Sequence, residues 1–210
     1  MSKVTLKAIK TRIYPNVEQQ YKIVNTFGCC RFVWNQLLDM QIERYHNGGK
    51  FVSEFGMNYL IKCLKQEYPF LKKVDSRSLL HVSRDLNNAF QKLFKEHSGY
   101  PKFKSRKFPK QSYQSGYANN NICQVGKHKL KVPKLGTIYF RSGRQITGKI
   151  KNVTIKLSST GKFYAVVLVD TEVNRLDSTN QSIGIDMGVA DLMITSDGVK
   201  YARKKKGIEF

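Results

Sequence analysis

The spacing of apolar residues along the chain changes after His97, and this change limits the folds that the chain can adopt. Before His97, apolar residues recur at helical spacing, whereas afterwards short apolar segments follow one another between Gly or Ser-Gly turns. These segments lie at 121–126, 129–136, 137–142, 152–159 and 162–170. Their alternating basic and apolar residues are typical of antiparallel strands with one polar face. We therefore expect an α+β protein whose strands form a small antiparallel β-barrel.

The N-terminal segment 3–14 shows the same alternation, and Pro15 ends it. Because no strand-like segment follows nearby, we expect this strand to pair with the later ones. The helical residues in between would then be an insertion into the sheet. Oligonucleotide-binding barrels have this kind of sequence pattern, although many small barrels bind nothing.

Four helices are expected between these strands. Asn16 suits the N-cap of the first, with Gln19 as its capping partner. Its apolar stripe would be Val17, Tyr21, Val24 and Phe27. Gly28 should end it, a second helix should run to the Gly pair at 48–49, and further helices fit 53–66 and 76–95. The first pair could be a helix-turn-helix that reads DNA, although an ordinary helical hairpin fits the same pattern.

The amino-acid composition indicates which class of partner the protein binds but does not indicate which reaction it catalyses. The chain has 37 Lys and Arg against 15 Asp and Glu, a formal net charge of +22. Such an excess repels itself unless a polyanion neutralises it, so nucleic acid is the expected partner, as it is for a ribosomal or chromatin-type packing protein. No apolar stretch is long enough to span a membrane, and Lys7, Lys10 and Arg12 interrupt the N-terminus. We therefore expect a cytoplasmic protein without a membrane partner.

The four cysteines do not have metal-binding spacing. Cys29 and Cys30 are adjacent, and Cys63 and Cys123 stand alone. A zinc ribbon requires paired C-x-x-C motifs, so no zinc site is expected in this chain. We expect all four to be buried as small apolar side chains.

No Asp or Glu occurs between Ser98 and Val169, where there are fifteen Lys and Arg. Cations that contact phosphates, interleaved with rings that stack on bases, suit single-stranded or irregular nucleic acid. The alternative is a solvated basic loop whose rings only anchor it to the core. The candidate nucleic-acid-binding residues are Lys102, Phe103, Lys104, Arg106, Lys107, Lys110 and Tyr113 in the first part, and Lys129, Lys131, Arg141 and Arg144 among the strands.

Residues 182–198, SIGIDMGVADLMITSDG, place one acid at the end of an apolar run. At this position Asp186 is a candidate metal ligand, or alternatively a residue that caps a turn. Asp191 and Asp197 lie at expected turns, and SDG is typical of a hairpin. Two-metal hydrolysis requires several carboxylates, whereas magnesium binds weakly to a single one.

Three segments, in this order, resemble the TnpB (OrfB) proteins of insertion sequences, relatives of the type V CRISPR effector nucleases. They are YPNVEQQYKIVNTFGCCRFVWNQLL, RDLNNAF with GYPKFKSRK, and GIDMGVADLMITSDG, and they span essentially the whole chain. The resemblance implies a wedge-type barrel, an inserted four-helix recognition unit and the first strands of an RNase H-like RuvC domain. The expected domains are a first barrel strand at 1–15, the helical insertion at 16–98, the basic loop and barrel at 99–173, a linker at 174–181 and the RuvC start at 182–210.

The resemblance also implies an activity, the cleavage of DNA chosen by a guide RNA next to a short target motif. The family nuclease uses three carboxylates with magnesium or manganese, and Asp186 matches the first carboxylate. The other two and the zinc ribbon lie beyond the matched part, so we expect a truncated, transposon-encoded nuclease with an incomplete site. The alternatives are half of a split nuclease completed in trans, or a nuclease-dead nucleic-acid-binding regulator. The sequence leaves the oligomeric state open.

The expected fourth helix departs from the family pattern. The family often has two Gln where this chain reads LLHVSRDL, with Leu80 and His81 in their place. In the family that pair lies toward the target-motif DNA. His81 and Arg84 are therefore the target-motif candidates, and the change leaves open which motif they contact.

Overall fold

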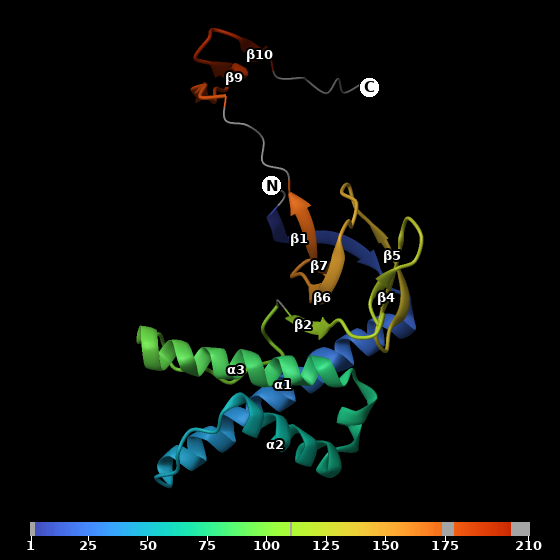
Figure 1. The fold of residues 1–210 in the computed structure, drawn as a ribbon, viewed down its shortest axis with the longest axis vertical. Helices are drawn as coiled ribbons and strands as arrows, with labels where there is room; N and C mark the ends of the chain where they lie inside the picture. Colours follow the sequence, from blue (N-terminus) through green and yellow to red (C-terminus); the bar gives the residue numbers. More distant parts are fainter. Residues whose placement is uncertain (1–2, 110, 174–178, 203–210) are drawn as a thin grey trace. The chain divides into compact units, whose positions relative to one another are not determined.

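The computed structural model describes residues 3–109, 111–173 and 179–202 of the chain. It divides into two compact units, Lys3–Val173 and residues 174–210 with Met1–Ser2. The first unit contains helices and a seven-stranded antiparallel sheet (Figure 1), and three short strands belong to the second. This mixture of helices and antiparallel strands confirms the α+β class. No helix among the described residues is long and apolar enough to cross a membrane.

The helical part of the first unit consists of three α-helices and one 3-10 helix, so the expectation of four helices was wrong. They are α1 (Val17–His46), α2 (Glu54–Glu67), η1 (Pro69–Lys73) and α3 (Ser76–Glu96). The predicted capping box is confirmed, because Asn16 Oδ1 accepts from Gln19 N at 2.8 Å and Asn16 N donates to Gln19 Oε1 at 3.1 Å.

Gly28 does not interrupt α1, and the expected helix-turn-helix therefore becomes one continuous helix. A glycine inside a helix costs only about 1 kcal/mol relative to Ala. Burial of its neighbours Phe27, Cys29 and Cys30 outweighs that cost. The Phe27 ring packs edge-on against Tyr113, with 5.7 Å between the ring centroids.

The buried face of the first turns of α1 differs from the predicted stripe. Val17, Tyr21 and Val24 are exposed, and Ile23 is buried together with Phe27. Helical spacing identifies residues that share a face, but it does not identify which face the rest of the fold covers. The cysteine prediction was also only half right, because Cys29 and Cys30 are buried whereas Cys63 is exposed.

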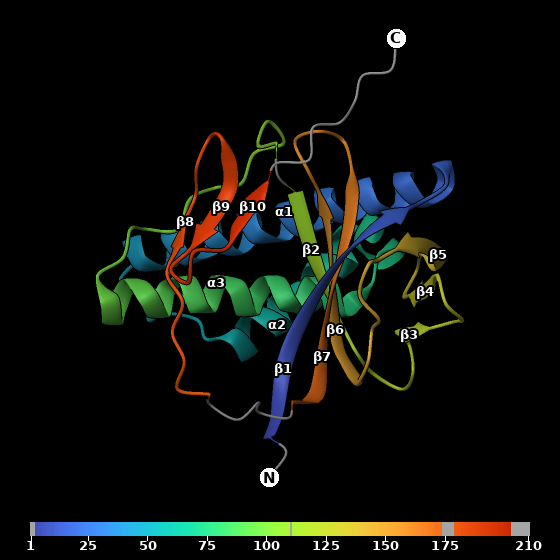
Figure 2. The same cartoon turned by 90° about the horizontal axis from the view of Figure 1, so that it is seen from above.

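The sheet has the strand order β2-β6-β7-β1-β5-β4-β3. Its strands are β1 (Lys3–Tyr14), β2 (Gln111–Gly116), β3 (Cys123–Gln124), β4 (Lys129–Val132), β5 (Gly136–Arg141), β6 (Lys149–Leu157) and β7 (Phe163–Val173). Figure 2 shows α1 and α3 crossing behind β2, β6 and β7. The described strands form an open sheet. Oligonucleotide-binding barrels are themselves partly open, so the wedge-type assignment stays a prediction.

The long-range pairing of β1 is confirmed. Its residues from Lys3 to Arg12 pair with β7, and its last three residues pair with β5. The helices therefore interrupt a sheet that β1 begins and the strands after His97 complete. Buried side chains alternate along β1, with Ile9, Thr11 and Ile13 facing the core.

Strand β2 was not expected, because residues 111–116 are mostly polar. It pairs with β6 and packs against α1 and α3 (Figure 1), burying Tyr113 and Ser115. Asp75, the N-cap of α3, joins the two parts: its carboxylate accepts hydrogen bonds from Ser115 Oγ at 2.5 Å, Ser78 Oγ at 3.2 Å and Arg77 N at 3.3 Å. The helices and the sheet are thus joined by this polar link in addition to one hydrophobic core.

The C-terminal unit contains β8 (Ile185–Asp186), β9 (Asp191–Thr195) and β10 (Lys200–Ala202), in the order β10-β9-β8. The predicted SDG hairpin is present, with Gly198 at φ +85°. The linker predicted at 174–181 falls largely on residues 174–178, outside the described residues.

Candidate nucleic-acid interface

One face of the sheet carries a row of basic and aromatic side chains across four strands. Lys156 of β6 lies opposite Tyr164 of β7, Tyr164 opposite Arg12 of β1, and Arg12 opposite Arg141 of β5. Directly paired residues project from the same face of a sheet, and neighbouring strands are about 4.8 Å apart. The row is therefore a line of cations and rings across β6, β7, β1 and β5.

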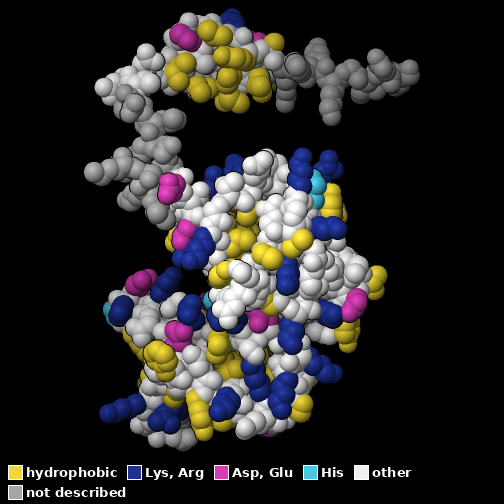
Figure 3. All heavy atoms as spheres, turned by 45° about the vertical axis from the view of Figure 1, so that its right-hand side comes forward, with side chains coloured by type: hydrophobic (Ala, Val, Ile, Leu, Met, Phe, Trp, Pro, Cys, Tyr) yellow, Lys and Arg dark blue, Asp and Glu magenta, His cyan; other side chains and the backbone are white. Residues whose placement is uncertain are grey.

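Adjacent positions extend this row into a surface, which we call the outer sheet face. It consists of Lys10, Arg12, Tyr14, Lys129, Tyr139, Arg141, Lys156 and Tyr164, which are exposed or half-buried. Lys10 Nζ lies 4.6 Å from the Tyr164 ring centroid, and Arg12 Cζ lies 5.0 Å from that of Tyr14. A hollow of about 300 Å³ beside Lys10, Lys156 and Tyr164 also belongs to this face. Figure 3 shows Lys and Arg side chains over much of the visible surface and few acids.

The sequence had identified only part of this surface. Lys129 and Arg141 were predicted, whereas Lys10, Arg12, Lys156 and the three tyrosines were missed. Basic alternation in 3–14 was visible, but the register that brings it beside Lys156 was not. Of the other predicted strand residues, Lys131 is exposed on β4 and Arg144 is exposed after β5.

The basic segment, residues 100–109, is held on α1 along its backbone. Trp34 Nε1 donates to Lys102 O at 3.0 Å, and Asn35 bonds both Lys104 O and Lys104 N, at 3.0 and 2.8 Å. Lys104 Nζ lies 3.6 Å from the Trp34 ring centroid. Although Lys104 as a residue is exposed, desolvation lowers the pKa of its ammonium group, against the raising effect of nearby Asp85. Lys104 therefore already has a partner in the fold.

The other residues predicted between Lys102 and Tyr113 differ in position. Lys102, Phe103, Arg106 and Lys107 are exposed and available to a ligand. Tyr113, which was expected to stack on bases, is instead buried against Phe27, and burial raises the pKa of its phenol. Its ring packs in the core because β2 turns it inward. Lys110 lies outside the described residues.

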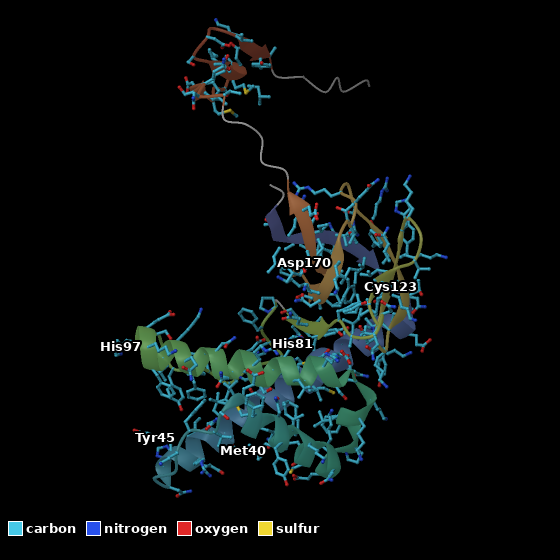
Figure 4. All side chains as sticks on the ribbon, in the orientation of Figure 1. Met40, Tyr45, His81, His97, Cys123 and Asp170 are labelled. Atoms are coloured by element: carbon cyan, nitrogen blue, oxygen red, sulfur yellow. The ribbon has the colours of Figure 1, made fainter. Side chains whose placement is uncertain are left out.

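The two predicted target-motif candidates, His81 and Arg84, line one pocket of about 270 Å³ between α3 and the strands β2 and β6. We call it the α3–β2 pocket. Arg77, Tyr117 and Lys151 also line it, and none of these was predicted. His81 lies between α3 and β2 (Figure 4), so close to Gly116 that a Cβ there would be 3.1 Å from His81 Nε2.

The charges of the α3–β2 pocket are partly balanced. Arg84 contacts Glu54 at 3.3 Å, and Lys151 contacts Asp170 at 2.7 Å. Desolvation lowers the pKa of His81, and Arg84 adds to this effect. Above pH 6.5 the imidazole is therefore predominantly uncharged, with one nitrogen that donates and one that accepts a hydrogen bond.

Asp186, the predicted metal ligand, lies exposed on β8 opposite Ile194. Asp197 accepts a hydrogen bond from Thr195 Oγ1 within the hairpin turn, and this bond lowers the pKa of the Asp197 carboxyl. Among the described residues, no group of three His, Cys, Asp or Glu side chains is placed to hold a metal ion. Asp186 is thus not part of such a group among the described residues, and a lone carboxylate does not make a donor set for magnesium or manganese.

The chain is a strongly basic α+β protein. Its helices are inserted into an antiparallel sheet, and that sheet carries a row of cations. Comparison with known proteins shows which proteins this chain resembles. Residues 1–50 match the family HTH_OrfB_IS605, described as a helix-turn-helix domain. In this structure those residues form β1 and the continuous α1, so the family name does not describe two separate helices here.

Two curated proteins match nearly the whole chain. It is 31% identical over 199 residues to the "Putative RNA-guided DNA endonuclease InsQ" of Escherichia coli (strain K12), covering 93% of this chain and 48% of InsQ. It is 27% identical over 203 residues to a "Putative RNA-guided DNA endonuclease" of Streptomyces pristinaespiralis, covering 95% and 50%. The chain therefore spans about half the length of these relatives. The resemblance to the TnpB (OrfB) family is confirmed, and the match fits the N-terminal half of its proteins.

Proposed function

We propose that this chain is the nucleic-acid-binding part of an RNA-guided DNA endonuclease of the TnpB family. The row Lys156–Tyr164–Arg12–Arg141 carries the proposal, because it aligns cations for phosphates and a ring for stacking on one accessible face. Guide RNA is the ligand that we assign to this face. The names of both relatives support a guide RNA and a DNA target as partners.

The α3–β2 pocket is assigned to the target DNA. Arg77, Arg84 and Lys151 suit phosphates, and neutral His81 suits a base edge, which presents both donors and acceptors. In the same proposal the sheet of the first unit is the wedge-type domain, and β8 to β10 are the first strands of a RuvC-like domain. Asp186 would then supply one carboxylate for magnesium or manganese.

The test is salt-dependent binding of a 20-nucleotide single-stranded RNA, measured by fluorescence anisotropy. If six to ten phosphates are contacted, affinity should fall by about 10³ to 10⁵ between 50 and 200 mM salt. The triple variant Lys10→Ala, Arg12→Ala, Lys156→Ala should bind less tightly and lower the slope of log K against log salt by about one for each lost contact.

The matched control removes the same charge from the helical part, with Lys62→Ala, Lys72→Ala and Lys73→Ala, all exposed residues. We expect it to change the slope far less than the triple variant on the sheet. Equal losses in the two variants would reduce the effect to net charge and contradict a role for the outer sheet face.

A further inference from the structure

The helical part contains another, chemically different cavity of about 260 Å³, at the end of α1 and the end of α3. Its walls are mainly aromatic and include Tyr45, Phe51, Phe90, Phe94 and Tyr100. Tyr45 projects from the last turn of α1 (Figure 4). Pockets for drug-sized ligands usually measure about 300–1,000 Å³, so this smaller cavity suits one ring system.

The rings that form the cavity pack against one another and fix its shape. The centroids of Phe51 and Phe90 are 5.1 Å apart, and those of Phe90 and Tyr100 are 5.7 Å apart. Phe94 is stacked on Phe90 at 5.9 Å, yet 55% of Phe94 is exposed. Tyr45 is 77% exposed. The cavity therefore has a packed aromatic floor and accessible rings at its opening.

A glycine turn after α1 positions the basic side of the opening. Gly49 N donates to Arg44 O at 2.8 Å, and a Cβ on Gly49 would lie only 2.6 Å from Arg44 Cγ. Arg44 Nε donates to Lys50 O at 2.6 Å. This turn holds the Arg44 guanidinium against the backbone of Lys50, and Lys50 itself lines the cavity. Among the described residues, none that lines the cavity is Asp or Glu.

One buried amide supplies polar atoms inside the cavity. Gln41 Nε2 donates to Val52 O at 2.7 Å, and Gln41 Oε1 accepts from Val52 N at 3.1 Å. Among the described residues each amide atom makes one of the two hydrogen bonds of which it is capable, and Gln41 lines the cavity.

We propose that this cavity binds one unpaired nucleobase of a nucleic-acid strand, with Lys50 and Arg44 beside the phosphates that flank it. The inference rests on the proposed nucleic-acid binding but concerns a separate site. Rings that stack on a base, cations at the opening and one amide for a base edge form the combination that single-stranded nucleic acids require. An aromatic side chain of a protein partner would use the rings but would not use the cations.

The test compares a 12-nucleotide single-stranded DNA with an all-abasic strand that carries the same phosphates. Phe94→Ala should weaken binding of the intact strand about tenfold, because one base loses its stacking partner. Binding of the abasic strand and the salt slope should stay unchanged. Leu93→Trp, which fills the cavity from its wall, should have the same effect without removing a ring. Circular dichroism and thermal unfolding confirm that each variant is folded.

Phe55→Ala is the control, because Phe55 is 85% exposed on α2 and does not line the cavity. It should leave both affinities unchanged. Equal affinity of the intact and abasic strands for wild type, or no effect of Phe94→Ala and Leu93→Trp, would overturn the base site while salt-dependent binding survives. If neither strand binds, the proposed function fails as well. Adenosine monophosphate that binds as tightly as the 12-mer would mean a free-nucleotide site and would also overturn the proposal.

Discussion

Asn35 holds Lys104 by both of its backbone polar groups, donating to the carbonyl oxygen at 3.0 Å and accepting from the N–H at 2.8 Å. This pairing fixes the basic segment on α1 while Lys102 and Arg106 stay exposed. Gln41 holds Val52 in the same way two turns further along α1. The long helix thus orders two loops by amide side chains.

Asn35→Ala should destabilise the chain by about 1 kcal/mol, because it removes two exposed hydrogen bonds. Urea unfolding measures the change, and hydrogen exchange should show loss of protection at the Lys104 N–H. Asn35→Asp keeps the acceptor but not the donor, so it should cost less. Unchanged exchange at Lys104 in Asn35→Ala would contradict this role of Asn35.

Gly28→Ala should stabilise the chain by about 0.5–1 kcal/mol. Gly28 is helical, and an added Cβ would meet only Arg31 Nη2, at 3.9 Å. Ala has the higher helix propensity and restricts the unfolded chain. Gly148→Ala is the opposite case, because Gly148 has φ +106° and its Cβ would lie 2.0 Å from Asp170 O. Thermal unfolding should give a higher Tm for the first variant and a lower Tm for the second, and a lower Tm for Gly28→Ala would indicate a break in α1.

His81 should make stability depend on pH in the acidic range. Desolvation, Arg84 and Arg77 lower its pKa below the ordinary 6.5, while Asp85 and Asp75 act in the opposite direction. The unfolded chain therefore binds a proton at a higher pH than the folded chain does. This contribution is fully present above pH 6.5 and is lost as the pH falls through the folded pKa. Tm measured from pH 8 to pH 5 should fall less in His81→Gln than in wild type, and equal falls would contradict the prediction.

The C-terminal strands should exchange their amide hydrogens faster than the sheet of the first unit. Strands β8, β9 and β10 contain two, five and three residues, and Ile183, Ile185 and Leu192 are 57%, 57% and 46% exposed. Short strands without a covered apolar face are marginally stable in water. Native-state hydrogen exchange should show fast exchange at 182–202 and slow exchange in β1 and β7. Equal protection in both regions would contradict this.

The 210-residue chain should not cut DNA by itself, and Asp186→Ala should leave that result unchanged. Magnesium binds weakly to a single carboxylate, and two-metal hydrolysis requires several. The assay combines the chain with guide RNA, target DNA and magnesium or manganese. Guide-dependent cutting that disappears in Asp186→Ala would contradict the prediction and would mean that Asp186 belongs to a complete site.

Local signals allowed the sequence to predict the parts of the fold that depend on them. The capping box of Asn16 and Gln19, the starts of α2 and α3 and the SDG turn each depend on a few neighbouring residues. The pairing of β1 was predicted because a strand without a nearby partner must pair elsewhere. The predicted helix end at Gly28 was wrong, because the burial of neighbouring side chains outweighs the low helix propensity of glycine. Strand β2 was missed because Gln and Ser do not favour a strand.

The surfaces were less predictable, since they depend on register. Lys156 and Arg12 lie on either side of β7 in one row only because each pairs with Tyr164. Charge density in the sequence predicted Lys104 as a ligand contact, but its ammonium lies over Trp34. The aromatic cavity joins Tyr45 and Phe51 to Phe94, and helical spacing within one segment carries no information about contacts between segments.

The order in which the strands are made has a consequence for synthesis. β1 leaves the ribosome first, but its partners β5 and β7 follow only after the whole helical insertion. At about 5–20 residues per second, synthesis from Tyr14 to Gly136 takes on the order of ten seconds. The helices can fold in that interval, whereas the sheet must wait for contacts between distant residues, which form slowly. The first strand therefore emerges unpaired, and its basic residues keep it in solution until β5 and β7 are made.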